Sequence, residues 1–325
     1  MNASAAGRPR IHWFRNDLRL ADNPSLAAAA ADGAPLLCFY VLDEDGPWAL
    51  GGAQRWWLHH SLARLGEAIA ERGGALILRR GPGAESVLRF AAEVDAAGVS
   101  WNRLYDPASI ARDKTVKAAL RADGRAADSY LADALLEPWA LKTGSGRPYQ
   151  VFTPFGRAAR AALEPLDAPQ PAPVRLDAPA QTPPSDRLED WGLLPTKPDW
   201  AGGLRAAWTP GEAGAEARLA DFVKGPVSRY GDQRDLPAVE GTSKLSPHLR
   251  WGEISPRQVW TAAAAKPASD KFLTELLWRE FARNLLFHFP DLPNANLKSD
   301  FDAFPWGDDA GALDAWRAGR TGYPI

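Results

Sequence analysis

The chain has 325 residues, a length that allows one large or two ordinary domains. Hydrophobic residues make up 46% and charged residues 24%, which is typical of a soluble protein with a substantial core. The net charge of −2 excludes a strong overall attraction to nucleic acid, so such a partner would need a local basic patch. The single cysteine, Cys38, excludes an internal disulfide, and no apolar run predicts a membrane span. We expect a cytoplasmic protein, without a metal site because no Cys/His cluster stands out.

Short β-branched or aromatic runs alternate with helical patterns over residues 11–135, after a segment at 1–10 that we expect to be flexible. The expected strands are 11–14, 35–43, 75–80, 99–105 and 129–131. The expected helices between them are 25–31, 54–72, 84–97 and 109–122. This βαβα order predicts an α/β domain built on a doubly wound parallel sheet.

A charged loop follows the first expected strand. It reads Trp-Phe-Arg-Asn-Asp-Leu-Arg-Leu over 13–20 and continues with Asp-Asn-Pro at 22–24. Doubly wound sheets place ligand loops at this edge, so the segment is a candidate ligand site. The other interpretation is that its arginines and aspartates pair with one another and serve only the fold. The residues alone leave both open.

The alternating pattern breaks between residues 136 and 204, where we expect a connector. Nine of the 28 prolines lie within 165–198, a composition typical of a segment that runs over the surface. Helical patterns then cover 213–223, 246–251, 255–265, 272–289 and 310–318. They predict an all-helical second domain over 205–325.

Two expected helix starts in the second domain are rich in polar groups. Ser-Pro at 246–247 and Ser-Pro at 255–256 each predict an N-cap followed by proline at the first helical position. Thr-Ser-Lys at 242–244 precedes the first of them. Hydroxyls, an amine and free backbone N–H groups at a helix start suit a diphosphate.

The expected helix at 272–289 is apolar around nearly its whole circumference, which is typical of a buried helix. Glu275, Trp278 and Arg279 are spaced i, i+3 and i+4, so they share one face of it. One interpretation is an ion pair between Glu275 and Arg279 within the helix. The other is a stripe that lines a cavity for a flat polar ligand.

Three segments resemble signature blocks of the DNA photolyase and cryptochrome family. They are Thr-Ser-Lys-Leu-Ser-Pro at 242–247, Trp-Gly-Glu-Ile-Ser-Pro-Arg at 251–257 and Glu-Leu-Leu-Trp-Arg-Glu-Phe at 275–281. They stand in the family's order with similar spacing, and the loop at 13–24 resembles the opening of the same proteins. Within the family, the chain is most similar to bacterial class I cyclobutane pyrimidine dimer photolyases.

The resemblance implies a light-driven DNA-repair lyase with an incomplete helical FAD-binding domain behind its α/β domain. In such enzymes reduced FAD passes an electron to a cyclobutane pyrimidine dimer, the ring splits, and the electron returns. The implied partner is UV-damaged DNA, met by a monomer, and photolyases are themselves a standard example of base flipping. An antenna pigment is also implied, either methenyltetrahydrofolate or a deazaflavin.

The resemblance also implies roles for individual residues. Catalytic roles fall to Glu275, Trp278 and, as the outer tryptophan of an electron relay, Trp306. FAD contacts fall to Tyr230, Thr242, Ser243, Lys244, Leu245, Ser246, Phe272 and Arg279. DNA contacts fall to Arg234, Glu275, Leu276, Leu277, Trp278, Arg279, Glu280, Phe281, Ala282 and Arg283.

The chain departs from the family's pattern after residues 319–325, where photolyases continue with further helices. We therefore expect no measurable repair by this chain alone. Lys244 stands at a variable position of the flavin motif, and Phe272 replaces a tryptophan common in some relatives. Two alternatives remain: a cryptochrome-type blue-light photoreceptor, which shares these motifs, and a non-catalytic remnant.

Overall fold

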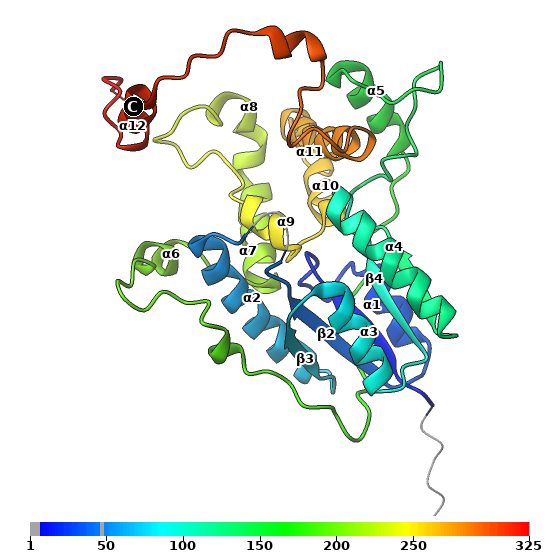
Figure 1. Ribbon diagram of the computed structural model, residues 1–325. Helices are drawn as coiled ribbons and strands as arrows, with labels where there is room; N and C mark the ends of the chain where they lie inside the picture. Colours follow the sequence, from blue (N-terminus) through cyan, green and yellow to red (C-terminus); the bar gives the residue numbers. More distant parts are fainter. Residues whose placement is uncertain (1–6, 46–48, 325) are drawn as a thin grey trace, which may run out of the picture. The chain divides into compact units, whose positions relative to one another are not determined.

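The computed structural model describes residues 7–45 and 49–324 (Figure 1). Its contacts divide the chain into a large unit that ends at His288 and a small unit that begins at Phe289. The large unit holds a five-stranded sheet and most of the helices. Most of the predicted flexible segment at 1–10 lies outside the described residues, although Arg8 donates to Asp95 at 2.8 Å.

All five strands of the sheet are parallel, in the order β3-β2-β1-β4-β5. Their bounds are Arg10–Phe14 for β1, Leu36–Leu42 for β2, Leu76–Arg80 for β3, Gly98–Asn102 for β4 and Ala126–Tyr130 for β5. Ile11 in the central strand lies opposite Leu37 on one side and Val99 on the other. β2 is buried along its whole length, as expected for a strand covered on both faces.

Four helices cover the two faces of the sheet (Figure 1). They are α1 Pro24–Ala31, α2 Gly52–Ala70, α3 Gly83–Glu93 and α4 Pro107–Ala122. Apolar side chains of α1 and α2 cluster with Cys38, whereas those of α3 and α4 cluster with Phe39. Because neighbouring residues of a strand point to opposite faces, the two helix pairs lie on opposite sides. The predicted doubly wound parallel sheet is confirmed.

The segment predicted as a connector is more ordered than its composition indicates. Helix α5, Phe152–Ala162, was not predicted, and it buries Phe155 in a cluster with the later helices. The proline-rich part contains only the short 3₁₀ helix η1, Leu188–Trp191, among its described residues. Its Leu176 and Trp191 are nonetheless buried in the core of the α/β part. The prediction of a purely surface segment is wrong there, because these apolar side chains fix it to the sheet domain.

The predicted helical region follows. In the large unit it consists of α6 Gly202–Ala207, α7 Glu212–Lys224, η2 Pro226–Arg229, α8 Tyr230–Gln233, α9 Ser246–Trp251, α10 Pro256–Ala264 and α11 Asp270–His288. The small unit holds η3 Ser299–Ala303 and α12 Ala310–Arg317. No helix in the described part of the chain is long and apolar enough to cross a membrane.

The long helix α11 is buried along one stripe rather than on every side. Leu273, Leu277 and Phe281 pack into a cluster with α5, α7 and α10, whereas Trp278 is exposed. The apolar pattern predicts neighbours on every side of α11, and part of that surface is left exposed. The physical reason is that the described neighbours of α11 cover only the stripe.

The two predicted helix starts differ. Ser255 is the N-cap of α10: its Oγ accepts a hydrogen bond from the N–H of Gln258 at 2.9 Å, which confirms that prediction. Ser246 is instead the first residue of α9, and Leu245 occupies the N-cap position without a side-chain bond. The N-cap prediction for Ser246 is wrong because Leu245 already has a right-handed helical conformation.

The charged loop at 13–24 joins the α/β part to the helical part of the large unit. Arg19 is buried and donates to the carbonyl oxygen of Gly252 at 3.0 Å. Asp22 accepts from Ser255 Oγ at 2.5 Å and from Arg257 Nε at 3.1 Å. The charged side chains of this loop therefore pair with distant segments and not with one another, as Asp22 does with Arg257 and Arg15 with Asp113.

The Asp22 contacts predict a pH-dependent stability. Burial raises the pKa of Asp22, but hydrogen bonds from Arg257 and Ser255 outweigh it, and the pKa lies below its ordinary value of 3.8. The ionised carboxylate therefore stabilises the fold at neutral pH, and this contribution is lost as the pH falls through the lowered pKa. Asp22→Asn should cost about 2 kcal/mol of unfolding free energy at pH 7 and less in strong acid. Urea denaturation at both pH values measures this, and an equal loss at both would contradict it.

Candidate functional site

The predicted phosphate-contacting loop has a distinctive backbone. Lys244 has a φ of 51°, in the left-handed region, and Leu245 follows in the right-handed region. Successive residues of opposite hand direct their N–H groups to one side, which makes a concave anion-binding nest. The N–H groups of Ser243 and Lys244 make no hydrogen bond to other residues that the structure describes. Helix α9 has only six residues, so few peptide dipoles add up at its N-terminus. The N–H groups of the nest are therefore better suited to bind an anion than the start of α9.

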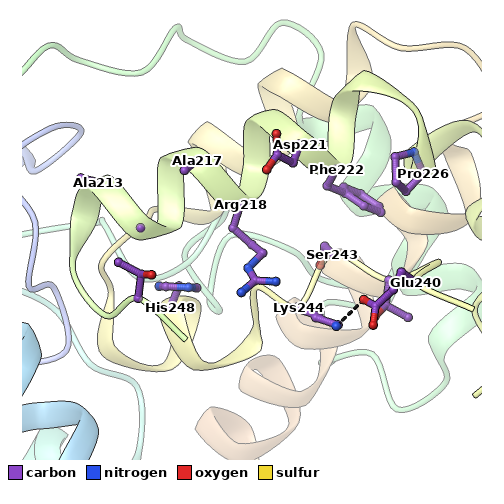
Figure 2. Close-up of a pocket in the computed structure, with 13 residues that line it drawn as sticks. Ala213, Ala217, Arg218, Asp221, Phe222, Pro226, Glu240, Ser243, Lys244 and His248 are labelled. Atoms are coloured by element: carbon purple, nitrogen blue, oxygen red, sulfur yellow. Dashed lines mark ion pairs between the residues drawn. The ribbon is translucent and has the colours of Figure 1, made fainter. Parts of the chain in front are cut away.

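The loop lines a cavity of about 580 Å³ together with α7, here called the α7 cavity (Figure 2). Figure 2 shows the guanidinium of Arg218 reaching from α7 toward the loop that carries Ser243 and Lys244. The ammonium group of Lys244 pairs with Glu240. Arg218 lies over Trp208, with 5.0 Å between its Cζ and the ring centroid. The cavity therefore combines two cations, the carboxylates of Asp221 and Glu240, and hydroxyl donors, and Arg218 is a component that the sequence analysis missed.

A buried polar cluster lies beside the α7 cavity. His248 lines the cavity, and its Nδ1 is 2.5 Å from Glu253 Oε2. The other carboxylate oxygen of Glu253 accepts from Trp57 Nε1 at 2.9 Å and from the N–H of Gly211 at 2.7 Å. Glu253 and His248 are buried. The carboxylate thus connects α2, the start of α7 and α9, and it fixes the ring that forms part of the cavity wall.

A second cavity of about 830 Å³, here called the α11 cavity, lies beside Ser246. Its charged lining includes Arg250, Arg279, Arg283 and Asp133, and Asp133 pairs with Arg279 and Arg283. The structure therefore divides the predicted FAD contacts. The residues at 242–244 line the α7 cavity, whereas Ser246 and Arg279 line the α11 cavity.

The two arginines of α11 are already paired. Arg279 Nη2 donates to Asp133 Oδ1 at 2.9 Å, and Arg283 Nη2 donates to Asp133 Oδ2 at 2.5 Å. A further bond joins Arg279 Nη1 to the Asp133 carbonyl oxygen at 2.8 Å. Both guanidinium groups thus share one carboxylate in this structure, and the role of Arg279 and Arg283 as a DNA-facing rim stays a prediction.

The alternative of an ion pair between Glu275 and Arg279 is wrong. Glu275 pairs with Arg234, which lies next to α8, and its carboxylate is 3.8 Å from Lys271 Nζ. Arg234 also donates to Asp235 at 3.3 Å. Glu275 therefore lies in a partly exposed cluster of alternating charges, and the predicted DNA contact Arg234 is brought next to the predicted catalytic carboxylate.

Several predicted DNA contacts lie in the interior. Leu276, Leu277, Glu280 and Phe281 are buried, so they support α11 and do not face a DNA surface. Glu280 Oε2 accepts from the N–H of Leu135 at 2.8 Å, and burial raises the pKa of this carboxyl group. The helix spacing puts these residues on the packed stripe, which is why a continuous run of contacts from 275 to 283 is impossible on one surface.

Three predicted FAD contacts belong to an apolar cluster. Phe272 lies 5.2 Å from Tyr230 and 4.6 Å from Phe222 between ring centroids, and Leu245 is buried in the same cluster. Burial raises the pKa of the Tyr230 hydroxyl. The side chain of Leu245 offers no donor, its N–H donates to Ser243 Oγ at 3.4 Å, and the ring of Phe272 serves packing here.

The remaining predicted residues are exposed. Trp278 keeps 45% of its surface accessible and stacks on Phe152 of α5, while Ala282 lies one turn further along α11. Trp306 lies in the small unit, 76% exposed, with its ring 4.7 Å from that of Phe304. Exposed indoles are available for stacking with a partner.

A third cavity, of about 500 Å³, lies where β1, β2 and β4 end. The guanidinium groups of Arg15 and Arg112 lie over the ring of Trp13, at 4.8 Å and 5.1 Å from its centroid. Arg15 is held by Asp113 at 2.7 Å. Doubly wound sheets bind ligands at the carboxyl ends of their strands, so the place suits a ligand. The ring of Trp13 is itself buried beneath the two guanidinium groups.

Comparison with known proteins decides the family. Residues 10–174 match the DNA photolyase family model, and residues 272–325 match the model for the FAD binding domain of DNA photolyase. The chain belongs to the DNA photolyase and cryptochrome family. The phosphate-contacting loop and the α7 cavity lie between the two matched segments, whereas Glu275 and Trp278 lie inside the second one.

Members of both branches of the family are similar to the chain. The deoxyribodipyrimidine photo-lyase of Agrobacterium fabrum is 48% identical over 98% of this chain and 67% of its own length. Cryptochrome-2 of Arabidopsis thaliana is 35% identical over 97% of this chain and 54% of its own length. A bacterial class III photolyase structure from Agrobacterium tumefaciens superposes with a TM-score of 0.93 at 45% identity, covering 99% of this chain and 68% of that one. The chain thus spans about two thirds of these photolyases and about half of the plant cryptochrome.

Proposed function

We propose that the protein acts as a deoxyribodipyrimidine photolyase, which uses light and FAD to split cyclobutane pyrimidine dimers in DNA. The observation that carries the proposal is the exposed surface of α11. There, within the segment that matches the family's FAD-binding domain, Trp278 is open to solvent and Glu275 is held by Arg234. An apolar ring beside an oriented carboxylate suits a flat ligand that also presents polar edges.

Two photolyase classes, class I and class III, are candidate assignments for this chain. The signature blocks favour class I, whereas the 45% identity and the TM-score of 0.93 with the Agrobacterium structure support class III. We favour class III for this chain, since that likeness extends over 99% of it.

The residues of the α7 cavity fit the diphosphate of FAD. The Lys244–Leu245 nest offers backbone N–H groups, Thr242 and Ser243 offer hydroxyls, and Arg218 and Lys244 offer positive charge. When bound, FAD would supply the light-driven electron. These residues would hold and orient it, and the buried Glu253–His248 pair would keep the cavity wall rigid. Rigid positioning matters because electron transfer requires a fixed geometry between the two reacting groups.

The lesion would be met by α11. In the proposal, the Trp278 indole contacts the pyrimidine rings and Glu275 accepts or donates hydrogen bonds at their polar edges. Arg234 holds the carboxylate toward the same surface. Trp306 in the small unit is proposed as the outer tryptophan of the electron relay, supported by its exposed ring.

The cavity at the strand ends is proposed to hold the antenna pigment. Its place at the carboxyl ends of the strands supports this proposal, and the two candidates are methenyltetrahydrofolate and a deazaflavin. The protein is proposed to work as a monomer in the cytoplasm.

Substitutions at Lys244 test the flavin proposal. Lys244→Gly removes the ammonium group but keeps the left-handed backbone, whereas Lys244→Val places a β-branched residue where φ is 51°. We expect Lys244→Val to weaken FAD binding about tenfold, because the strain disrupts the nest. Lys244→Gly should weaken it less. Flavin fluorescence titration measures both, with Lys224→Ala at the exposed end of α7 as the control. Equal losses for the two Lys244 variants would show that the charge matters and the nest does not.

Selective DNA binding tests the function itself. The chain is titrated with an oligonucleotide that contains one thymine dimer and with the undamaged oligonucleotide, each with FAD present. A clear preference for the dimer supports a photolyase, whereas FAD binding without that preference supports the cryptochrome alternative, which the 35% identity to Cryptochrome-2 favours. Binding of neither FAD nor DNA would leave the non-catalytic alternative.

Repair by this chain alone is a separate matter. The predicted FAD contacts are divided between the α7 cavity and the α11 cavity, so no single cavity in the described part of the chain fixes the flavin against the lesion. We therefore expect no restoration of pyrimidines above a no-protein control when the chain is illuminated with reduced FAD and dimer-containing DNA.

A further inference from the structure

The indole of Trp278 is held in a fixed orientation by aromatic neighbours. The ring of Phe152 in α5 lies parallel to it, with centroids 3.6 Å apart and an interplanar angle of 8°. Phe281 meets both rings edge-on, at 5.8 Å from each. One face of the indole is thus covered, and 45% of the side chain remains accessible.

This stack is more than core packing. Phe155 already fills the interior of the contact between α5 and α11. It is buried, and its ring centroid lies 5.1 Å from that of Phe281. Phe152 lies one turn earlier, at the partly exposed margin of the same contact. A face-to-face pair at a margin adds little burial but restricts the rotamers of both rings.

Gly156 provides the room for the Phe152 ring. It lies one turn after Phe152 in the interior of α5, where glycine is an unfavourable residue. A Cβ atom at Gly156 would lie 3.3 Å from Cζ of Phe152, closer than ordinary van der Waals contact. A side chain at this position would therefore displace the Phe152 ring from its place in the stack.

We infer that Phe152, seated by Gly156, is a positioning residue that fixes the Trp278 indole for stacking against a pyrimidine of the lesion. The inference rests on the proposed function. A tryptophan that is already ordered loses less conformational freedom when the base arrives, so its stacking contributes more fully to affinity. Phe152 itself touches the indole and not the DNA, and its effect should appear in lesion selectivity.

The test compares the affinity ratio between dimer-containing and undamaged oligonucleotides for a set of variants. We expect Phe152→Ala to lower this ratio about fivefold, because an unrestrained indole must be ordered on binding. Phe152→Tyr keeps an aromatic face and should retain the wild-type ratio. Gly156→Ala should lower the ratio through the displaced ring, although it favours the helix.

Phe155→Leu is the matched control, since it perturbs the same helix contact without touching the stack. It should lower the melting temperature and leave the ratio unchanged. An unchanged ratio in Phe152→Ala, or an equal drop in Phe155→Leu, would overturn the positioning role while the wild-type preference stands. A wild-type chain with no preference for the dimer would overturn the proposed function and this inference together.

Discussion

Trp278→Ala is expected to remove most of the preference for dimer-containing over undamaged DNA. Base–aromatic stacking is worth about 1–3 kcal/mol per base in alanine substitutions, so the affinity ratio should fall roughly ten- to hundredfold. The effect should be confined to the lesion, because undamaged DNA does not present an extruded base to α11. Fluorescence anisotropy with the two oligonucleotides measures the ratio.

Trp139→Ala is a matched control for this variant. Its indole is 44% exposed, nearly the same as that of Trp278, and it lies 5.5 Å from the ring of Phe287. Loss of an equally exposed tryptophan should leave lesion selectivity unchanged. If both variants lowered the ratio equally, or if Trp278→Ala weakened both DNAs alike, the proposed lesion contact would be wrong.

Arg234→Ala should give a different pattern. A phosphate contact carries no lesion information, so its loss should weaken both oligonucleotides and reduce the slope of log K against log salt by about one. Arg234 also pairs with Glu275, so Arg234→Ala removes the partner of that carboxylate as well as a phosphate contact. A change confined to the dimer-containing DNA would assign Arg234 to the orientation of Glu275 and not to phosphate binding.

The sheet could be predicted from the sequence because its signals are local. β2 is a continuous apolar run, and parallel strands covered on both faces require that pattern. The boundaries were less secure: the strand expected at 99–105 ends at Asn102, where the chain turns toward the Asp106 cap of α4. Helix α5 was missed because Pro154 and Gly156 both lower helix propensity. Pro154 is tolerated in the first turn, and Gly156 is offset by the packing of Phe152.

The sequence predicts which types of residue form the site, but not which charged side chains pair with one another. Glu275 and Arg279 have the spacing of an intrahelical pair, yet Asp133, 146 residues away in sequence, takes Arg279. The spacing of residues within one helix gives no information about a partner so distant in the sequence. The loop after β5 reaches α11 only in the folded chain. Arg218 shows the same limit, since nothing in the sequence of α7 indicates that it faces the phosphate loop.

Glu253→Gln is expected to give the largest loss of stability in the chain. The carboxylate accepts from Trp57 Nε1 and from the N–H of Gly211, while its other oxygen lies 2.5 Å from His248 Nδ1. A glutamine can keep its oxygen for Trp57 and Gly211, but its NH₂ group then faces His248 Nδ1, which can accept only when the imidazole carries its proton on Nε2. The substitution also replaces charge-assisted hydrogen bonds, each worth about 1.5–3 kcal/mol, by weaker neutral ones.

Urea denaturation measures that loss, and Glu240→Gln is the comparison. Glu240 is also an ion-paired glutamate beside the α7 cavity, but it is exposed, and exposed pairs contribute about 0–1 kcal/mol. The difference in unfolding free energy between the two variants therefore shows how much more the buried carboxylate contributes than the exposed one. Because His248 lines the cavity, Glu253→Gln should also weaken FAD binding under conditions where the chain is still folded. Equal stability of Glu253→Gln and the unmodified chain would contradict the structural role of this carboxylate, since its partners come from three separate segments that only the fold brings together.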